Sequence, residues 1–401
     1  MSHDSHELAV PAAEDFNPKD AGGLPTILLV VGAIGILGSF LGFAVPAWRQ
    51  QSAHSYLFSF AYFFTISVGC LFWTCLHHAT DSEWSVVVRR QLENLAGLLP
   101  YLAILFLPLL FVADYLWEWW PLKRGDDPML DAKLPYLTHW FFLIRYALYF
   151  VILGLLAWTL KSRSIAQDYD GAARHSFIMR KFGVAGIPAV ALCLTFAAFD
   201  WLMSLQYEWY STMWGVYIFA GAAGSSMSLL VLVVTALKDR GYLKVVNLEH
   251  YHIMGKYMLA FVIFWAYIGF SQYMLIWYAN IPEETSYFQM RNTAGWYYLS
   301  NLLVIGRFFL PFPVLLLQWV KKKPRYLCIV AGWVLFMQLL DIYVIVLPAL
   351  HGNRGMPSIF DVLSLAGIGG VLGWLFFRAL GQTHLFPTRD PRLAASLKLT
   401  N

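Results

Sequence analysis

The sequence predicts an all-α integral membrane protein with about ten transmembrane helices. Of its 401 residues, 59% are hydrophobic and 17% are aromatic, whereas only 13% are charged. A soluble domain has about 25% charged residues, so this chain has too little polar surface to be dissolved in water. The second observation is a series of apolar runs of about 20 residues, which is the length that a helix needs to cross a bilayer.

The apolar runs divide the chain into ten predicted spans with short connections. From the amino terminus they lie at 24–45, 55–79, 95–119, 138–160, 182–205, 211–236, 253–279, 295–320, 326–347 and 358–380. We expect one transmembrane domain at 24–380, with an amino-terminal tail at 1–23 and a carboxyl-terminal tail at 381–401. Residues 1–23 are polar and acidic, unlike a signal peptide, so the first run is predicted to be a true span.

The orientation follows from the positions of Lys and Arg relative to these spans. Nineteen of the 28 lie on the side of the two tails, six lie on the opposite side, and three lie within spans. Basic residues accumulate on the cytoplasmic side of membrane proteins, so both termini are predicted to be cytoplasmic. The net charge of +4 is spread over short loops, so we expect no nucleic-acid partner.

Spans two to five and spans six to nine start on the same side and run in the same directions, which indicates an internal repeat. Asp200 in span five and Asp341 in span nine occupy corresponding positions, as do Arg145 in span four and Arg307 in span eight. The pattern predicts two four-helix bundles, flanked by spans one and ten.

Two GxxxG pairs predict that spans one and ten dock closely against other helices. The pairs are Gly38 with Gly42 in span one and Gly369 with Gly373 in span ten. Small residues at this spacing let two helix backbones approach each other, whether within one chain or between partners.

Ionisable residues inside spans are costly in a bilayer and need a structural or functional reason. Three aspartates, Asp114, Asp200 and Asp341, are predicted to lie in the outer third of their spans. Two arginines, Arg145 and Arg307, are predicted within spans four and eight. These residues either form structural ion pairs or line a wet cavity for proton or quinone handling, and the sequence leaves both interpretations open.

Span two carries a polar stripe that runs from mid-membrane to the cytoplasmic end. Its members fall at helical spacing: Ser67, Cys70, Thr74, His77, His78 and Asp81. Hydroxyl, imidazole and carboxyl groups in series are the components of a proton relay; the alternative is a hydrogen-bonding helix–helix face with interfacial histidines. Lys256 in span seven is a further candidate, although its amine is more simply explained by snorkelling to the interface.

No redox centre is expected in this chain. The sequence has no CxxCH motif for covalent haem, and its four cysteines lie singly in apolar segments without the spacing of an iron–sulfur site. A b-type haem needs histidines well inside facing helices, whereas the histidines here fall at span ends or in loops.

Two long segments resemble a known family of membrane subunits. They are FAAFDWLMSLQYEWYSTMWGVYIFAG at 196–221 and MGKYMLAFVIFWAYIGFSQYMLIWYANIPEET at 254–285. Both look like the second NrfD-type, or polysulfide-reductase-like, membrane subunit of bacterial alternative complex III. The ten-span layout agrees, so the resemblance covers essentially the whole membrane region. It places Asp200 within FDWLMSL and Lys256 within MGKY.

The resemblance implies one subunit of a multi-chain quinol:electron-acceptor oxidoreductase in the bacterial cytoplasmic (inner) membrane. Its expected partners are a homologous NrfD-type subunit with the quinol site, an iron–sulfur subunit, c-type cytochrome subunits and membrane lipids. Haem c and iron–sulfur clusters are expected only in those partners. The second NrfD-type subunit is itself expected to be cofactor-free and to contribute structure and proton half-channels, with quinone as a candidate ligand.

The alternative function is a self-contained secondary transporter. Transporters of this kind commonly interrupt helices at matching places in their two halves. Pro188 in span five has no counterpart in span nine, and Pro311 and Pro313 in span eight have none in span four. This lack of matching interruptions favours the respiratory subunit.

Overall fold

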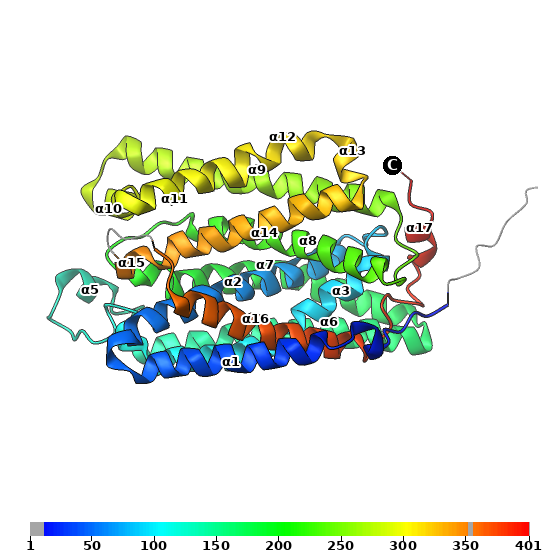
Figure 1. Ribbon diagram of the computed structural model, residues 1–401, viewed down its shortest axis with the longest axis horizontal. Helices are drawn as coiled ribbons and strands as arrows, with labels where there is room; N and C mark the ends of the chain where they lie inside the picture. Colours follow the sequence, from blue (N-terminus) through cyan, green and yellow to red (C-terminus); the bar gives the residue numbers. More distant parts are fainter. Residues whose placement is uncertain (1–11, 352–355, 401) are drawn as a thin grey trace, which may run out of the picture.

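The computed structural model describes residues 12–351 and 356–400, except for the side chains of Ala294 and His351. Within these residues, ten helices are long and apolar enough to cross a membrane. They lie side by side along the longest axis of the molecule (Figure 1). The protein is an all-α, multi-pass membrane protein, so this prediction is confirmed. Residues 1–11, Arg354 and Asn401, which entered the sequence predictions, lie outside the described part.

The spans are built from thirteen α-helical segments and one π-helical turn. They are α1 (Leu24–Ala44), α2 (Pro46–Ala79), α3 with α4 (Val86–Ala96 and Leu99–Leu110), α6 (His139–Asp170), α7 (Ala173–Trp201), α8 (Trp214–Asp239), α9 (Leu248–Ala279), α11, η4 and α12 (Ala294–Val304, Ile305–Phe309 and Pro311–Leu316), α14 (Pro324–Val346) with α15 (Pro348–His351), and α16 (Ile359–Leu380). Shorter helices in the connections and tail are α5 (Pro128–Lys133), α10 (Pro282–Arg291), α13 (Gln318–Lys321) and α17 (Leu393–Leu397).

The molecule has two distinct ends. The terminal end carries α17 and the described tail segments 12–23 and 381–400, and the distal end carries α5 and α10 (Figure 1). The two tail segments are tied together, because Leu385 N donates to Glu14 O at 2.8 Å and His384 Nδ1 lies 2.6 Å from Asp15 Oδ1. Both tails therefore lie on the same side of the helical body.

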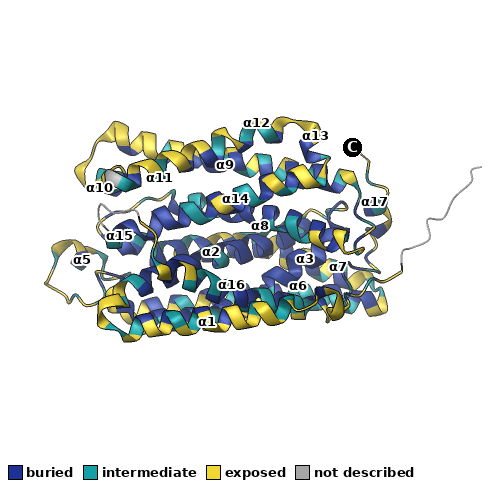
Figure 2. Cartoon of the chain, in the orientation of Figure 1, coloured by how far each residue is buried: buried dark blue, intermediate teal, exposed yellow. Residues whose placement is uncertain are grey.

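The body consists of two four-span groups that meet through α2 and α8. The first group contains α2, α3–α4, α6 and α7, and the second contains α8, α9, α11–α12 and α14. At the junction, Trp73 Nε1 on α2 donates to Ala223 O on α8 at 2.9 Å, and a Cβ on Gly69 would lie 2.6 Å from Ser226 Oγ. Because α2 contacts both groups, it is the most buried of the ten spans among the described residues (Figure 2). The predicted pair of bundles is confirmed.

Spans one and ten flank the bundles as a closely packed pair, but their closest backbone approach lies at glycines outside the predicted GxxxG pairs. A Cβ on Gly35 of α1 would lie 2.5 Å from Gly367 Cα of α16, and one on Gly370 would lie 2.6 Å from Gly32 N. These four glycines let the two backbones touch. By contrast, Gly38 and the other predicted GxxxG glycines face side chains such as Leu363.

Several predicted span boundaries are wrong, each for a local reason. Span two begins at Pro46, directly after span one, because proline is well suited to the first helical turn. The predicted loop at 161–181 is mostly helix, since α6 continues to Asp170 and the chain turns only at Gly171, which has the left-handed conformation (φ 66°) typical of a helix end.

Span three shows the largest shift, from the predicted 95–119 to Val86–Leu110. Its first half, α3, is wholly buried even though it contains Arg89, Arg90 and Glu93. An apolarity criterion excludes such a segment, because the criterion does not register that the charges are paired with other helices. At the other end, Pro108 removes a backbone donor in the last turn, and the helix ends at Leu110.

Candidate functional site

A buried ion pair joins α6 and α7 near the distal end of the first bundle. Arg145 makes two hydrogen bonds to the Asp200 carboxylate, from Nε at 2.8 Å and from Nη2 at 2.7 Å. The Tyr149 hydroxyl donates to the same carboxylate at 2.7 Å. Asp200 is fully buried, and the Arg145 guanidinium also lies 3.8 Å from the centre of the Tyr136 ring. The two hydrogen bonds of this bidentate pair offset the free-energy cost of removing both charges from water.

A second buried ion pair occupies the corresponding place in the second bundle. Arg307 Nη1 lies 2.6 Å from Asp341 Oδ2, and the carboxylate also accepts from the Tyr217 hydroxyl at 2.5 Å and from Trp265 Nε1 at 3.1 Å. Gln338 accepts a further hydrogen bond from Arg307. The second pair therefore repeats the arginine, aspartate and tyrosine of the first.

Arg307 lies in the π-helical turn η4 (Ile305–Phe309), which interrupts span eight. The extra residue of a π-turn changes the direction of the following side chains, and such turns are common at functional sites. Pro311 follows directly, at the start of α12, so span eight consists of two helical segments joined at this turn. Trp333 Nε1 holds the turn by donating to Gly306 O at 2.7 Å.

Two of the predicted site residues lie apart from these pairs. Asp114 was expected in the outer third of span three, but that span ends at Leu110, and Asp114 is exposed in the short turn η2 (Ala113–Tyr115). Lys256 is exposed on α9 and pairs with no acid among the described residues. The outer acid group therefore contains Asp200 and Asp341 but not Asp114.

The polar stripe of span two is buried as far as His78 and ends at an exposed acid. Ser67, Thr74, His77 and His78 are each at most 4% exposed. Thr74 Oγ1 donates to the backbone oxygen of Cys70 at 2.9 Å, and among the described residues no hydrogen bond joins two side chains of the stripe. Asp81, beyond the end of α2, is partly exposed and pairs with Arg180 and Arg392.

An aromatic contact separates the stripe from the first ion pair. Phe64 lies one helical turn before Ser67 on α2, and its ring centroid is 4.9 Å from that of Trp201, the residue after Asp200. Phe60 packs on Trp201 as well, at 5.7 Å. The stripe and the first ion pair are therefore flanked by aromatic rings in contact with each other.

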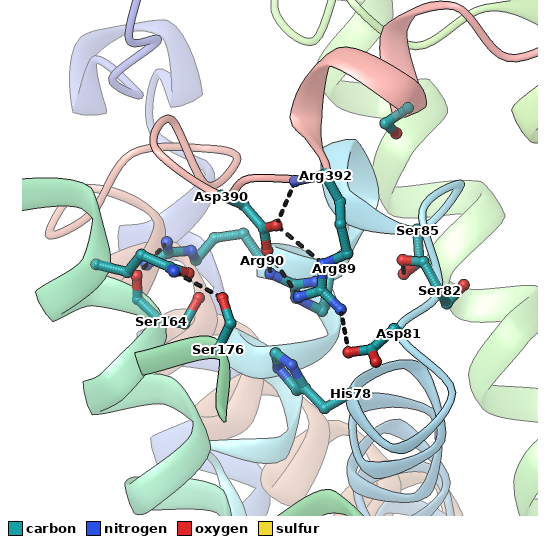
Figure 3. Close-up of polar contacts among 12 residues, drawn as sticks. His78, Asp81, Ser82, Ser85, Arg89, Arg90, Ser164, Ser176, Asp390 and Arg392 are labelled. Atoms are coloured by element: carbon teal, nitrogen blue, oxygen red, sulfur yellow. Dashed lines mark hydrogen bonds and ion pairs between the residues drawn. The ribbon is translucent and has the colours of Figure 1, made fainter. Parts of the chain in front are cut away.

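Beyond the stripe lies a buried network of charges at the terminal end that was not predicted from the sequence (Figure 3). On α3, Arg89 Nε lies 3.2 Å from Glu93 Oε1 and Arg90 Nε lies 3.3 Å from Glu93 Oε2. Arg90 Nη2 also lies 2.6 Å from Asp168 Oδ2 on α6, and His78 Nε2 lies 3.9 Å from Glu93 Oε1. The signal for this network was the spacing of Arg89, Arg90 and Glu93 within three to four residues, which is typical of one face of a helix.

Residues 381–400, which we call the C-terminal strap, complete this network. Arg89 Nη2 lies 2.6 Å from Asp390 Oδ2, and Arg392 binds both oxygens of Asp390 at 3.0 Å and reaches Asp81 at 3.2 Å. Burial alone would raise the pKa of Asp390, but the Arg89 and Arg392 guanidinium groups hold it below the ordinary value. Leu385 and Phe386 are fully buried. The described part of the predicted carboxyl-terminal tail is therefore packed against the helical body.

Two pockets adjoin these clusters. The distal pocket, of about 430 Å³, is lined mainly by apolar and aromatic side chains, including Tyr136, Phe196, Phe199, Met203 and Tyr207. It adjoins the first ion pair through Tyr136, whose hydroxyl is buried without a hydrogen-bond partner among the described residues. The terminal pocket, of about 280 Å³, is more polar and is lined by residues that include Asp15, Asp168, Thr383 and His384.

Within residues 12–351 and 356–400, no group of three or more His, Cys, Asp or Glu side chains is arranged to hold a metal ion. No protein-family model matches the chain, and comparison with curated proteins finds no match.

Proposed function

We propose that this chain is the second NrfD-type (ActF-type) membrane subunit of a quinol-oxidising respiratory complex of the alternative complex III class. In this proposal it is cofactor-free, lies in the bacterial cytoplasmic membrane, and contributes structure and two proton half-channels. The observation that carries the proposal is the pair of buried Arg–Asp–Tyr groups, one in each bundle. Ionisable groups inside membrane spans are a mark of proton and ion pathways.

The outer half-channel would use the two ion pairs. Protonation of Asp200 would weaken its bond to Arg145, whose guanidinium has the Tyr136 and Phe141 rings at 3.8 and 4.3 Å as alternative partners. Arg145 would then have two positions, one bonded to the ionised carboxylate of Asp200 and one against the rings when Asp200 is protonated. The pair in the second bundle has the same possibility, because Arg307 lies 4.4 Å from the Trp265 ring.

The inner half-channel would follow the span-two stripe from Ser67 to His77 and His78 and continue into the α3 network. Phe64 and Trp201 would separate the two halves at rest, as a hydrophobic barrier between proton-carrying groups requires. The distal pocket is the place in this chain that would take a quinone ring, by its volume and aromatic lining. The partners expected from the resemblance would supply haem c and the iron–sulfur clusters.

The test is the Asp200→Asn variant in the complex isolated in mild detergent and reconstituted into vesicles. We expect proton movement coupled to quinol oxidation to fall by about tenfold or more, because an amide neither carries a proton nor pairs with Arg145. A His77→Gln/His78→Gln variant should lower it as well. Asp114→Asn is the matched control, since Asp114 is exposed and lies outside both pairs. The readouts are vesicle acidification and cytochrome reduction.

Two results would contradict the proposal. One is unchanged proton movement in both variants while the complex stays intact, which would make the buried charges structural pairs. The other is purification of the native protein as a homogeneous single chain without cytochrome or iron–sulfur partners, which would favour the secondary transporter instead.

The proposal also places the terminal end in the cytoplasm, by the distribution of Lys and Arg. We expect a tag added after residue 401 to be accessible only from the cytoplasm. A membrane-impermeant thiol reagent should label Arg124→Cys, in the exposed segment before α5, only from outside. Three of the four native cysteines are buried, so the protein without the added cysteine should react weakly. Its labelling is the background for the variant. The reverse pattern would show that the orientation is wrong.

A further inference from the structure

Buried polar atoms without hydrogen-bond partners gather around α3 at the terminal end. Among the described residues, no ring nitrogen of His77 or His78 makes a hydrogen bond, and neither does the nitrogen or the oxygen of the Asn94 amide. Arg89 Nη1 and Arg90 Nη1 have none either. All five side chains are at most 1% exposed.

Buried polar atoms of this kind destabilise the folded protein unless water molecules hydrogen-bond to them. Each buried polar atom that lacks a partner costs about 1–3 kcal/mol, and native proteins satisfy groups of this kind with buried water. Water needs several polar neighbours at one place, and this cluster supplies imidazole, amide and guanidinium groups together. Trp84, whose ring centroid is 5.1 Å from that of His77, adds an indole N–H without a partner.

The terminal pocket adjoins this cluster at Asp168. One of its lining residues is Asp168, whose Oδ2 lies 2.6 Å from Arg90 Nη2 in the network. Another is Thr383 of the strap, whose hydroxyl is buried and has no hydrogen-bond partner among the described residues. Asp168 is therefore shared by the pocket and by the buried cluster.

The C-terminal strap is bonded to α3 and α6 beside the cluster. Gln91 Nε2 donates to Leu385 O at 2.8 Å, Thr388 N donates to Asp168 Oδ1 at 2.9 Å, and Asp390 binds Arg89. These bonds attach the strap along α3 and α6, with Asp390 lying beside the arginines in Figure 3.

We infer that the space among these side chains is a chamber that binds a cluster of ordered waters, entered through the terminal pocket at Asp168 and walled by the C-terminal strap. From Asp168 the polar path continues through Arg90 and Glu93 to His78, the last histidine of the span-two stripe. The use of these waters as the cytoplasmic mouth of the inner half-channel rests on the proposed function; the presence of the waters does not.

Hydroxyl-radical footprinting by X-ray radiolysis of the purified full chain tests for the waters, because radicals form from water bound inside the protein. Trp84 and His78 should be oxidised at least about fivefold faster than Trp73 if the chamber is wet. Trp73 is a matched control for His78, because both side chains are at most 1% exposed and the indole N–H of Trp73 is bonded to Ala223 O. Trp84 is 9% exposed, so its rate counts only together with that of His78. Equal rates at Trp84, His78 and Trp73 would overturn the inference.

A substitution in the pocket tests the entrance. Thr383→Leu places a larger apolar side chain in the wall of the pocket and narrows the route to Asp168, so oxidation of His78 should fall toward the rate of Trp73. Thr400→Leu, on the exposed end of the strap, is the control and should leave the rate unchanged. If Thr383→Leu has no effect on His78, the entrance at Asp168 is wrong.

The footprinting needs neither partner subunits nor proton transport, so it separates this inference from the proposed function. Fast oxidation of His78 together with unchanged proton movement in the Asp200 and histidine variants would retain the chamber and remove the proposed function. Slow oxidation of His78 would remove the chamber whatever the vesicle assay shows.

Discussion

Replacing Asp341 with alanine should destabilise the protein by about 3–5 kcal/mol, because the buried Arg307 guanidinium would lose its counter-ion. The substitution also removes the acceptor for Tyr217 and Trp265, so two further buried donors would be left without partners. The measurement is unfolding of the purified chain in mixed micelles with increasing denaturing detergent.

The control for this prediction is Asp114→Ala, which removes an exposed carboxylate and should change stability by less than about 0.5 kcal/mol. A double variant, Arg307→Met with Asp341→Leu, should lose less than Asp341→Ala alone, because it leaves no unpaired charge behind. If Asp341→Ala and Asp114→Ala are equally stable, the ion pair between Arg307 and Asp341 does not contribute to the stability of the fold.

Replacing Gly35 with leucine should detach α1 from α16 and cost about 3 kcal/mol or more. Any Cβ at Gly35 would lie 2.5 Å from Gly367 Cα, and the obstacle is backbone, which cannot rotate away as a side chain can. The pair would have to separate along its length, because Gly32 and Gly370 make the same kind of contact one turn further on. The same unfolding assay, with limited proteolysis near residue 23, measures the effect.

Gly332→Ala is the matched control for this prediction. Gly332 is a helical glycine in the interior of α14, and an added Cβ there meets no described heavy atom within 4 Å. Alanine has the higher helix propensity, so this variant should be stabilised by up to about 1 kcal/mol. A Gly35→Leu protein that is as stable as Gly332→Ala would contradict the close packing of α1 and α16.

The positions of the buried charges at the distal end were predictable from the sequence, but their pairing was only one of two possibilities. Asp200 and Arg145 are 55 residues apart, and hydropathy places both in spans without saying which faces meet. The repeat supplied the correspondence between the two sets. Tyr149 and Tyr217, which complete the sites, could not be distinguished from the many other aromatic residues, because tyrosine is also common at membrane interfaces.

The charge network at the terminal end was missed because its partners are distant in the sequence. Arg89 and Asp390 are 301 residues apart, and neither a loop with two arginines nor a polar tail is unusual by itself. A hydropathy window counts Arg89, Arg90 and Glu93 as reasons against a span, although each is neutralised inside the fold. Asp114 was wrongly placed inside span three because the residues after Leu110 are apolar, and the predicted span therefore ran beyond the end of the helix.

The contact between α1 and α16 has a consequence for how the chain is made. Gly35 leaves the ribosome early, whereas Gly367 follows roughly 330 residues later, which takes about 20–70 s at ordinary rates of protein synthesis. During that interval the first span is in the bilayer without the neighbour that it packs against most closely. Lipid or an insertion factor must cover its glycine face until the tenth span arrives. The flanking pair is therefore completed by the last span to be synthesised, and a chain truncated before α16 leaves the first span without its principal contact.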